Sequence, residues 1–339
     1  MSVLDVRDLS LEIDTPAGPV PILRDVGFAV APGEAVGLVG ESGSGKSMTL
    51  RAIARLLPPT ARPTGTIAIN GTPVGSLGRS ALRALRRREL GFVFQDPRAA
   101  VNPMHRVGDF LTEVVRDRRG DVRAATARAV DLLARIGVPD PERRLRQYPV
   151  ELSGGLLQRV VIAAALMGGP SLLLADEPTT ALDVTTQSDV LALVDELRRE
   201  QGTAMVFVTH DLDLALAVCD RVVVLYAGQV VEVASAASLT RAPLHPYTRG
   251  LFASRPPLDR RVEPMPAIDG VPAALADVPA GCPFQARCPI VQDRCRTWLP
   301  PLIPVGDELV RCHRVDELRA GTLIGRLPLV APAPTPAGA

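Results

Sequence analysis

A complete phosphate-binding loop constrains the fold of this chain more than any other feature. Residues 40–47 read GESGSGKS, which matches the pattern G-x-x-x-x-G-K-[ST]. The apolar run 35–39 before the loop predicts a buried strand, and residues 48–57 after it predict a helix that ends before Pro58. A strand, a glycine loop and a helix N-terminus together direct backbone N–H groups at an anion. The sequence therefore predicts an α/β fold built around a phosphate site.

Lys46 is the only lysine in the chain, and the other 37 of its 38 basic residues are arginines. A lysine ammonium is compact enough to lie within a ring of backbone N–H groups and phosphate oxygens, whereas a guanidinium is broad and planar. We therefore expect Lys46 to contact phosphate. The loop residues expected to bind the nucleotide are Gly40, Ser42, Gly43, Ser44, Gly45, Lys46 and Ser47.

Composition and segment lengths limit the other possibilities. The chain has 339 residues, 47% of them hydrophobic and 22% charged, which is typical of a globular protein with a large domain and a smaller one. The net charge of +1 gives no reason to expect a nucleic-acid partner. The longest apolar stretch, 160–175, is interrupted at 168–171, so we expect no membrane span. The first residues lack a signal-peptide pattern, and we expect a cytoplasmic location.

Further along the chain, apolar strands alternate with helices, which favours a parallel α/β core. Residues 98–158 are predicted to be mostly helical. The buried strand 171–176 ends in two acids, Asp176 and Glu177, and a later strand, 204–210, ends at His210. Two adjacent carboxylates at a buried strand end are costly unless a cation neutralises them. The first acid can hold Mg²⁺ together with Ser47, and the second can activate a water molecule.

Six motifs in this order resemble those of the ATP-binding cassette (ABC) ATPases of membrane transporters. The resemblance extends over residues 3–240 and implies a P-loop NTPase core with an antiparallel β subdomain and a helical subdomain at about 98–158. The motifs are the phosphate loop (Walker A), Gln95 (Q-loop), LSGGLLQR at 152–159 (signature), LLLADEP at 172–178 (Walker B), Ala181-Leu182-Asp183 (D-loop) and His210 (switch).

The resemblance implies ATP and Mg²⁺ as ligands and gives the motif residues their roles. Lys46 would contact the β- and γ-phosphates. Ser47 and Gln95 would coordinate Mg²⁺, with Asp176 placing it. Glu177 would be the general base that activates the attacking water.

The same resemblance implies that a second ATPase subunit completes the site. His210 would contact the γ-phosphate. Ser153, Gly154 and Gly155 would close over ATP held by the second subunit, and Asp183 would couple the two sites. One feature departs from the family pattern: Ile13 stands where an aromatic residue usually stacks on adenine, and residues 1–27 contain no aromatic side chain. We therefore expect loose selectivity for the base.

Other segments resemble the ATPases of dipeptide and oligopeptide importers. These are GFVFQDP at 91–97 and the run at 179–185, followed beyond residue 240 by His245-Pro246-Tyr247-Thr248 and a Pro-rich stretch. We therefore predict a nucleotide-binding domain over 1–240, the C-terminal extension of that family over 241–324, and a disordered tail over 325–339.

Four of the five cysteines gather in the predicted extension, at Cys282, Cys288, Cys295 and Cys312. Disulfides are disfavoured in the cytoplasm, and the two-residue gaps typical of structural zinc sites are absent. Four thiolates at such spacing suit an iron–sulfur cluster, and some members of the peptide-importer family carry a 4Fe–4S cluster in this region. Unligated thiols, zinc and His313 as a substitute ligand are the alternatives. The fifth cysteine, Cys219, is expected in the core.

The leading hypothesis for function is the ATPase subunit of a di- or oligopeptide importer, attached peripherally to the cytoplasmic face of the membrane. Its implied partners are two permease subunits, a paralogous ATPase and an extracytoplasmic solute-binding protein. Import of nickel or another small solute is the first alternative. A soluble ABC ATPase acting on ribosomes or DNA, and a cassette without catalytic activity, are more remote ones.

Overall fold

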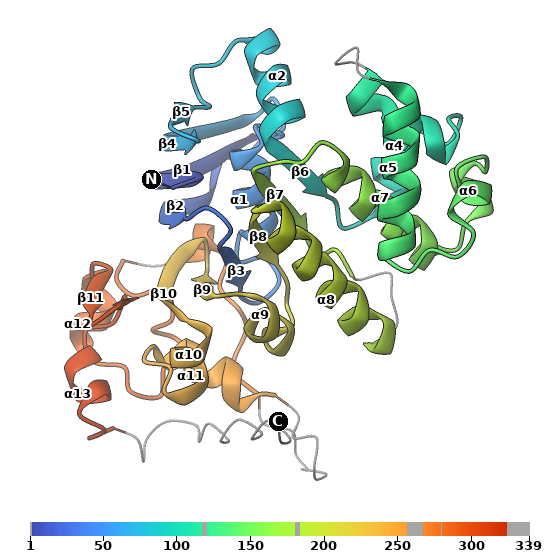
Figure 1. Cartoon of the computed structure of the whole chain (residues 1–339). Helices are drawn as coiled ribbons and strands as arrows, with labels where there is room; N and C mark the ends of the chain where they lie inside the picture. The colour runs from blue at the N-terminus through green and yellow to red at the C-terminus, as the bar shows by residue number, and fades with distance from the viewer. Residues whose placement is uncertain (1, 117–120, 180–183, 256–266, 279, 324–339) are drawn as a thin grey trace, which may run out of the picture.

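The computed structural model describes residues 2–116, 121–179, 184–255, 267–278 and 280–323, and contains two β-sheets (Figure 1). The predicted Asp183 and the predicted tail at 325–339 lie outside these residues. The strands of the larger sheet are, in spatial order, β11 (Ile303–Val305), β12 (Glu308–Val310), β10 (Gln229–Ser235), β9 (Arg221–Tyr226), β3 (Ala35–Val39), β8 (Ala204–Val208), β7 (Leu172–Asp176) and β6 (Leu90–Val93).

The larger sheet has a parallel centre, as the alternation of strands and helices predicted. β3 pairs in parallel with β8 and β9, and β7 pairs in parallel with β8 and β6. Every residue of β3, β7 and β8 is buried, which explains why these segments read as uninterrupted apolar runs. Because parallel strands end at the same edge of a sheet, the residues that directly follow β3, β6, β7 and β8 lie close together at that edge.

The smaller sheet is antiparallel, with the order β2 (Gly18–Val30), β1 (Leu4–Thr15), β4 (Ala61–Ile69) and β5 (Thr72–Pro73). Ile13 lies in it, paired with Val20 of β2 and Ala61 of β4. A shared core of buried residues joins this sheet to α1 (Lys46–Ile53) and the central strands. The antiparallel subdomain expected from the family resemblance is therefore present.

The helices between β6 and β7 form a helical arm, α2 (Arg79–Glu89) precedes β6 and contacts it, and, α1 aside, the other helices follow β7 in the chain. The helices of the arm are α3 (Pro97–Ala100), α4 (Val107–Arg116), α5 (Val122–Arg135), α6 (Pro141–Arg144), the short helix η1 (Pro149–Glu151) and α7 (Gly154–Met167). The others are α8 (Val184–Gln201), α9 (Leu212–Val218), α10 (Ala236–Arg241), α11 (Pro246–Ala253), η2 (Leu275–Asp277), α12 (Asp293–Thr297) and α13 (Val315–Arg319).

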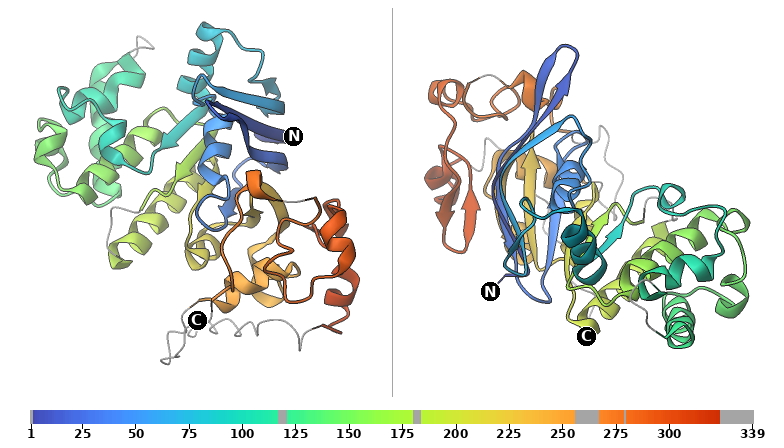
Figure 2. Two further views of the ribbon diagram at one scale, coloured as in Figure 1. Left: turned by 180° about the vertical axis from the view of Figure 1, so that it is seen from behind. Right: turned by 90° about the horizontal axis from the view of Figure 1, so that it is seen from above.

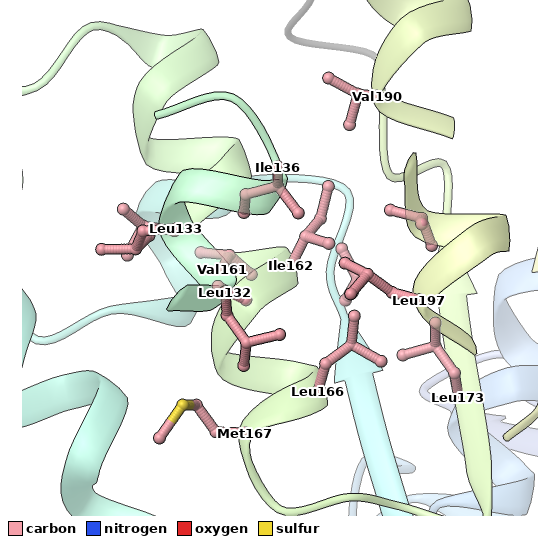
Figure 3. Packing of buried hydrophobic residues seen from close by; sticks show 14 of the residues in the cluster. Leu132, Leu133, Ile136, Val161, Ile162, Leu166, Met167, Leu173, Val190 and Leu197 are labelled. Carbon is pink, nitrogen blue, oxygen red and sulfur yellow. The ribbon is translucent and has the colours of Figure 1, made fainter. Parts of the chain in front are cut away.

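One hydrophobic core ties the helical arm to the central sheet (Figure 3). Leu132 of α5 and Ile136, the C-cap residue of that helix, pack with Ile162 and Leu166 of α7, and the same cluster reaches Leu173 of β7. Helices α4, α5 and α6 lie within the stretch 98–158 that was predicted to be mostly helical, while its bounds as a subdomain stay a prediction. Cys219 is 6% exposed and belongs to this core, as predicted.

The C-terminal extension is joined to the central sheet. Its hairpin, β11–β12, pairs with β10, so that Glu232 and Val233 lie opposite Val310 and Leu309. The extension and the helical arm lie at opposite ends of the molecule (Figure 2). The predicted boundary at residue 240 stays a prediction, since the extension continues the sheet of the preceding residues. Among the helices that the structure describes, none combines the length and apolar character needed to cross a bilayer.

Candidate nucleotide site

The phosphate loop connects β3 to α1, and two of its glycines are required by their surroundings. Gly40 has φ +151°, and a Cβ there would lie 2.2 Å from the carbonyl oxygen of Leu225. Gly45 has φ +99°, and a Cβ would lie 2.5 Å from Leu23 Cδ2. Both positions therefore need a residue without a side chain. Ser42 and Gly43 are exposed, so this part of the loop is accessible to a ligand.

Lys46 is buried, and its ammonium lies inside the loop. Nζ donates to the carbonyl oxygen of Gly40 at 2.7 Å and to that of Glu41 at 2.9 Å. Burial lowers the pKa of Lys46, whereas the carboxylates of Glu177, Asp176 and Glu41 act in the opposite direction. The ammonium is thus pre-positioned at the centre of the loop, where a polyphosphate would meet it.

Ser47 and Asp176 are brought together from positions 129 residues apart. The Ser47 hydroxyl donates to Asp176 Oδ1 at 2.8 Å. Asp176 is 3% exposed, and burial raises the pKa of its carboxyl group, opposed by the Ser47 hydrogen bond. A hydroxyl and a carboxylate side by side, next to a phosphate loop, are hard oxygen donors of the kind that Mg²⁺ takes. The residues present therefore fit the ion that the family resemblance implies.

Glu177 lies between Gln95 and His210. Gln95 Nε2 donates to Glu177 Oε2 at 2.9 Å, and His210 Nδ1 lies 3.3 Å from Glu177 Oε1. The backbone of Glu177 has φ +46°, a strained region for a non-glycine residue and one that is common at functional sites. The structure thus joins Gln95, Asp176, Glu177 and His210 into one group at the strand ends beside the phosphate loop.

The signature residues begin α7. The Ser153 hydroxyl accepts from the N–H of Leu156 at 3.4 Å and caps the helix. Ser153 is exposed, and a Cβ added to Gly154 would meet nothing within 4 Å among the described residues. A helix N-terminus of this kind can receive an anion from another molecule.

The four cysteines of the extension line one small cavity, of about 20 Å³, with His245 and His313. Burial raises the pKa of Cys282 to about 11 and those of Cys288 and Cys312 to about 12. A cavity of this size holds about one water molecule. Within the described ranges, no three His, Cys, Asp or Glu side chains are arranged to hold a metal ion. The donor chemistry suits iron–sulfur ligation, but in this structure the described thiols are not arranged as a metal-binding group, so the predicted cluster stays a prediction.

One set of contacts at the phosphate loop was not predicted. Arg287, from the cysteine-bearing segment, donates to both carboxylate oxygens of Glu41, at 2.7 and 3.1 Å. The N–H of Glu41 donates to the Tyr247 hydroxyl at 2.9 Å. Glu41 lies in the phosphate loop and Tyr247 in the segment 245–248, and both segments resemble motifs of known families. Their separation in the sequence nevertheless gives no indication that the extension contacts the loop.

The comparisons with known proteins agree with this geometry. Residues 23–180 match the ABC transporter family, and residues 231–295 match the family described as "Oligopeptide/dipeptide transporter, C-terminal region". The oligopeptide transport ATP-binding protein OppD of Escherichia coli (strain K12) is 42% identical over 302 residues, covering 89% of each chain. A putative peptide import ATP-binding protein of Brucella ovis is 42% identical over 333 residues, covering 94% of this chain and 98% of the relative.

A solved structure of the same fold supports the assignment. The ATP-binding cassette MJ0796, in a dimeric post-hydrolysis state bound to ADP and Pi, has a TM-score of 0.63 at 30% identity. It covers 69% of this chain and 98% of its own. The phosphate loop, the paired acids and the extension therefore identify this chain as a member of the ABC transporter ATPases, in the branch of the oligopeptide and dipeptide transport ATP-binding proteins.

Proposed function

We propose that this chain hydrolyses ATP to power the import of di- and oligopeptides through an ABC transporter. The observation that carries the proposal is the joint presence of the assembled group at Ser47, Asp176 and Glu177 and of the extension found in oligopeptide and dipeptide transporters. The names of the relatives, which refer to oligopeptide transport and peptide import, support the class of solute.

At the site, Lys46 holds the β- and γ-phosphates, together with backbone N–H groups of Gly43, Ser44 and Gly45. Ser47, Asp176 and Gln95 hold Mg²⁺, which supplies neutralisation of the charge that develops on the phosphate oxygens. Glu177 accepts the proton of the attacking water.

His210 completes this arrangement from the end of β8, where it contacts the γ-phosphate. Its ring lies beside Glu177 and its side chain is 68% exposed, so it is accessible to the nucleotide. The Gln95 amide donates to Glu177 and so orients this general base until Mg²⁺ and the nucleotide are present. We further propose that adenine binds near Ile13 without an aromatic stacking partner, so that selectivity for the base of the nucleotide is loose.

A second ATPase subunit, a paralogue, completes each site in our proposal. The exposed N-terminus of α7, with Ser153, Gly154 and Gly155, closes over the ATP of that subunit, and Asp183 couples the two sites. The dimeric state of the related cassette supports this arrangement. Substituting Ser153→Arg tests it: ATP affinity of the isolated chain should stay unchanged, while hydrolysis by the assembled transporter should fall. Normal hydrolysis in the assembled transporter would contradict the role in trans.

The chain reaches the membrane through two permease subunits, which receive solute from an extracytoplasmic binding protein. A cavity of about 220 Å³ between β6 and the helical arm supports a docking site for a permease segment; Phe92, Phe94 and Phe110 line it. Phe94 directly precedes Gln95, so a permease segment docked there can affect the hydrogen bond from Gln95 to the general base Glu177. Permeases should co-purify with the wild-type chain and not with Phe94→Glu. Equal recovery with both chains would exclude this cavity as the docking site.

Uptake by cells that carry the gene tests the solute. Deleting the gene should abolish uptake of labelled tripeptides, the wild-type gene should restore it, and Glu177→Gln should not. If the deletion instead removes nickel uptake and leaves peptide uptake intact, the transporter serves the alternative solute. A deletion that changes neither, but impairs translation or DNA maintenance, would overturn the assignment to import.

We also propose an iron–sulfur cluster on Cys282, Cys288, Cys295 and Cys312. The lining of one cavity by four thiols supports it, although the thiols would have to move to take a cluster. Protein purified without oxygen should contain iron and acid-labile sulfide, and Cys295→Ser should lose both. Colourless protein without iron would refute the proposal, and protein with zinc instead would support the alternative.

A further inference from the structure

Glu41 of the phosphate loop is held at three points, two of them by the extension and one by Lys46 of the loop itself. Its carboxylate accepts two hydrogen bonds from Arg287, its N–H donates to the Tyr247 hydroxyl, and its carbonyl oxygen accepts from Lys46 Nζ. Residues 41 and 287 are 246 positions apart. The conformation of this part of the loop is thus set by a segment that lies outside the nucleotide-binding motifs.

The Arg287 side chain is built into the extension before any ligand arrives. It is 4% exposed, and it also donates to the carbonyl oxygens of Asp269 at 2.9 Å and Ile268 at 3.1 Å. Tyr247 is fully buried, with its ring centroid 4.6 Å from that of Tyr226 and 5.4 Å from that of Phe284. Two rigid side chains therefore present a fixed cation and a fixed hydroxyl to the loop.

Charge explains why the loop needs this cation. The Glu41 carboxylate is a negative charge inside a loop that binds a polyanion, and an unpaired carboxylate there would repel phosphate. A bidentate arginine–carboxylate pair is the strongest common means of cancelling such a charge and of fixing its geometry. Holding Glu41 also lowers the entropy that the glycine-rich loop loses when it orders around phosphates.

We propose that Arg287 is a positioning residue for the nucleotide site, which cancels the charge of Glu41 and, with Tyr247, holds the phosphate loop in its binding conformation. The inference depends on the nucleotide site alone and is independent of the transported solute. Arg287 acts through Glu41 and does not touch the nucleotide. Because Cys288 follows Arg287 directly, the segment that lines the four-thiol cavity is the segment that holds the loop.

The test is a set of variants of the full chain, with the equilibrium affinity for a non-hydrolysable ATP analogue as the main readout. Arg287→Ala should weaken binding about 10-fold, the effect of losing a charge-assisted hydrogen-bonded pair. Adding Glu41→Gln should recover most of the loss, because the repelling charge is then gone. In steady state the KM for ATP should rise in Arg287→Ala while kcat changes little, and Arg287→Lys should recover part of the affinity.

A matched control separates this role from general stability. Arg314 pairs with Glu317 in the extension, with Nε–Oε1 at 2.8 Å, and also donates to Ile290 O at 3.1 Å. Arg314→Ala should lower the melting temperature without changing analogue affinity. The proposal is overturned if Arg287→Ala binds the analogue within twofold of wild type. It is equally overturned if Glu41→Gln fails to recover the affinity, or if Arg314→Ala weakens binding as much as Arg287→Ala does.

Discussion

The Ser47 hydroxyl donates a 2.8 Å hydrogen bond to Asp176 Oδ1, which joins the start of α1 to the end of β7. Parallel pairing places β7 next to β8 and β8 next to β3, so the phosphate loop and the acidic strand end share one edge of the sheet. Glu177 follows directly, with Gln95 and His210 on its two carboxylate oxygens. The two neighbouring groups can thus divide metal binding and water activation between them.

Ser47→Ala removes one of the three side chains that we propose hold the metal ion. We expect the Mg²⁺ concentration at half-maximal ATPase activity to rise about 10-fold, since loss of groups that support a metal site typically costs this much or more. The measurement is a Mg²⁺ titration at saturating ATP. Ser188→Ala, on the exposed surface of α8, is the control and should titrate as the wild type does. An unchanged titration for Ser47→Ala would remove Ser47 from the metal site.

Glu177→Gln keeps the shape of the side chain and removes its basicity. We expect kcat to fall by about 100-fold or more, because a positioned general base typically supplies that factor, while ATP affinity is retained. Single-turnover hydrolysis and equilibrium nucleotide binding measure the two quantities. Glu196→Gln, an exposed site on α8, is the matched control. Hydrolysis at the wild-type rate would show that another group activates the water.

Lys46→Arg keeps the positive charge but changes its shape. The Lys46 ammonium fits between two backbone carbonyl groups inside the loop, at 2.7 and 2.9 Å, where a planar guanidinium has no room. We expect ATP affinity to drop by about 10-fold or more, as for the loss of a charge-assisted contact. Nucleotide binding by calorimetry checks this. Affinity equal to wild type would mean that charge alone, and not the compact ammonium, is what the loop requires.

Glu232 makes stability depend on pH. It is fully buried, and burial raises its pKa to about 7 despite hydrogen bonds from the N–H groups of Leu244 and His245, with Glu308 adding to the shift. Because the pKa of Glu232 is higher in the folded than in the unfolded protein, this residue contributes a stabilisation that is fully present below pH 4.5. That contribution is lost as pH rises through about 7.

His245 acts in the opposite direction: burial lowers its pKa to about 3, so its contribution to stability rises with pH around the unfolded pKa of 6.5. Between pH 6.5 and 7.5 the loss from Glu232 is about 0.7 kcal/mol and the gain from His245 is about 0.4 kcal/mol, so we expect the free energy of unfolding to fall by about 0.3 kcal/mol. Urea unfolding at several pH values measures this. Glu232→Gln should abolish the fall over that range, and a fall that persists in the variant would assign it to another group.

The nucleotide site was largely predictable, because each of its parts lies in a short segment with its own signal. Glycines before Lys46, two acids after an apolar strand and a histidine after another strand define local backbone conformations and charges. Their convergence also followed from the sequence, since parallel strands end at one edge. The Gln95–Glu177 contact was not predicted, because the two residues follow separate strands and only the structure shows that their side chains meet.

The sequence by itself thus determined the ABC ATPase fold, the phosphate loop around Lys46 and the acids that accompany it. Only the tertiary structure decided how the extension meets that loop. The pairing of β12 with β10 and the reach of Arg287 to Glu41 join segments with no shared periodicity or motif. The cysteines likewise lie around one cavity, but their distances depend on packing between separate segments. Such contacts depend on the packing of the whole chain, and local sequence patterns do not encode them.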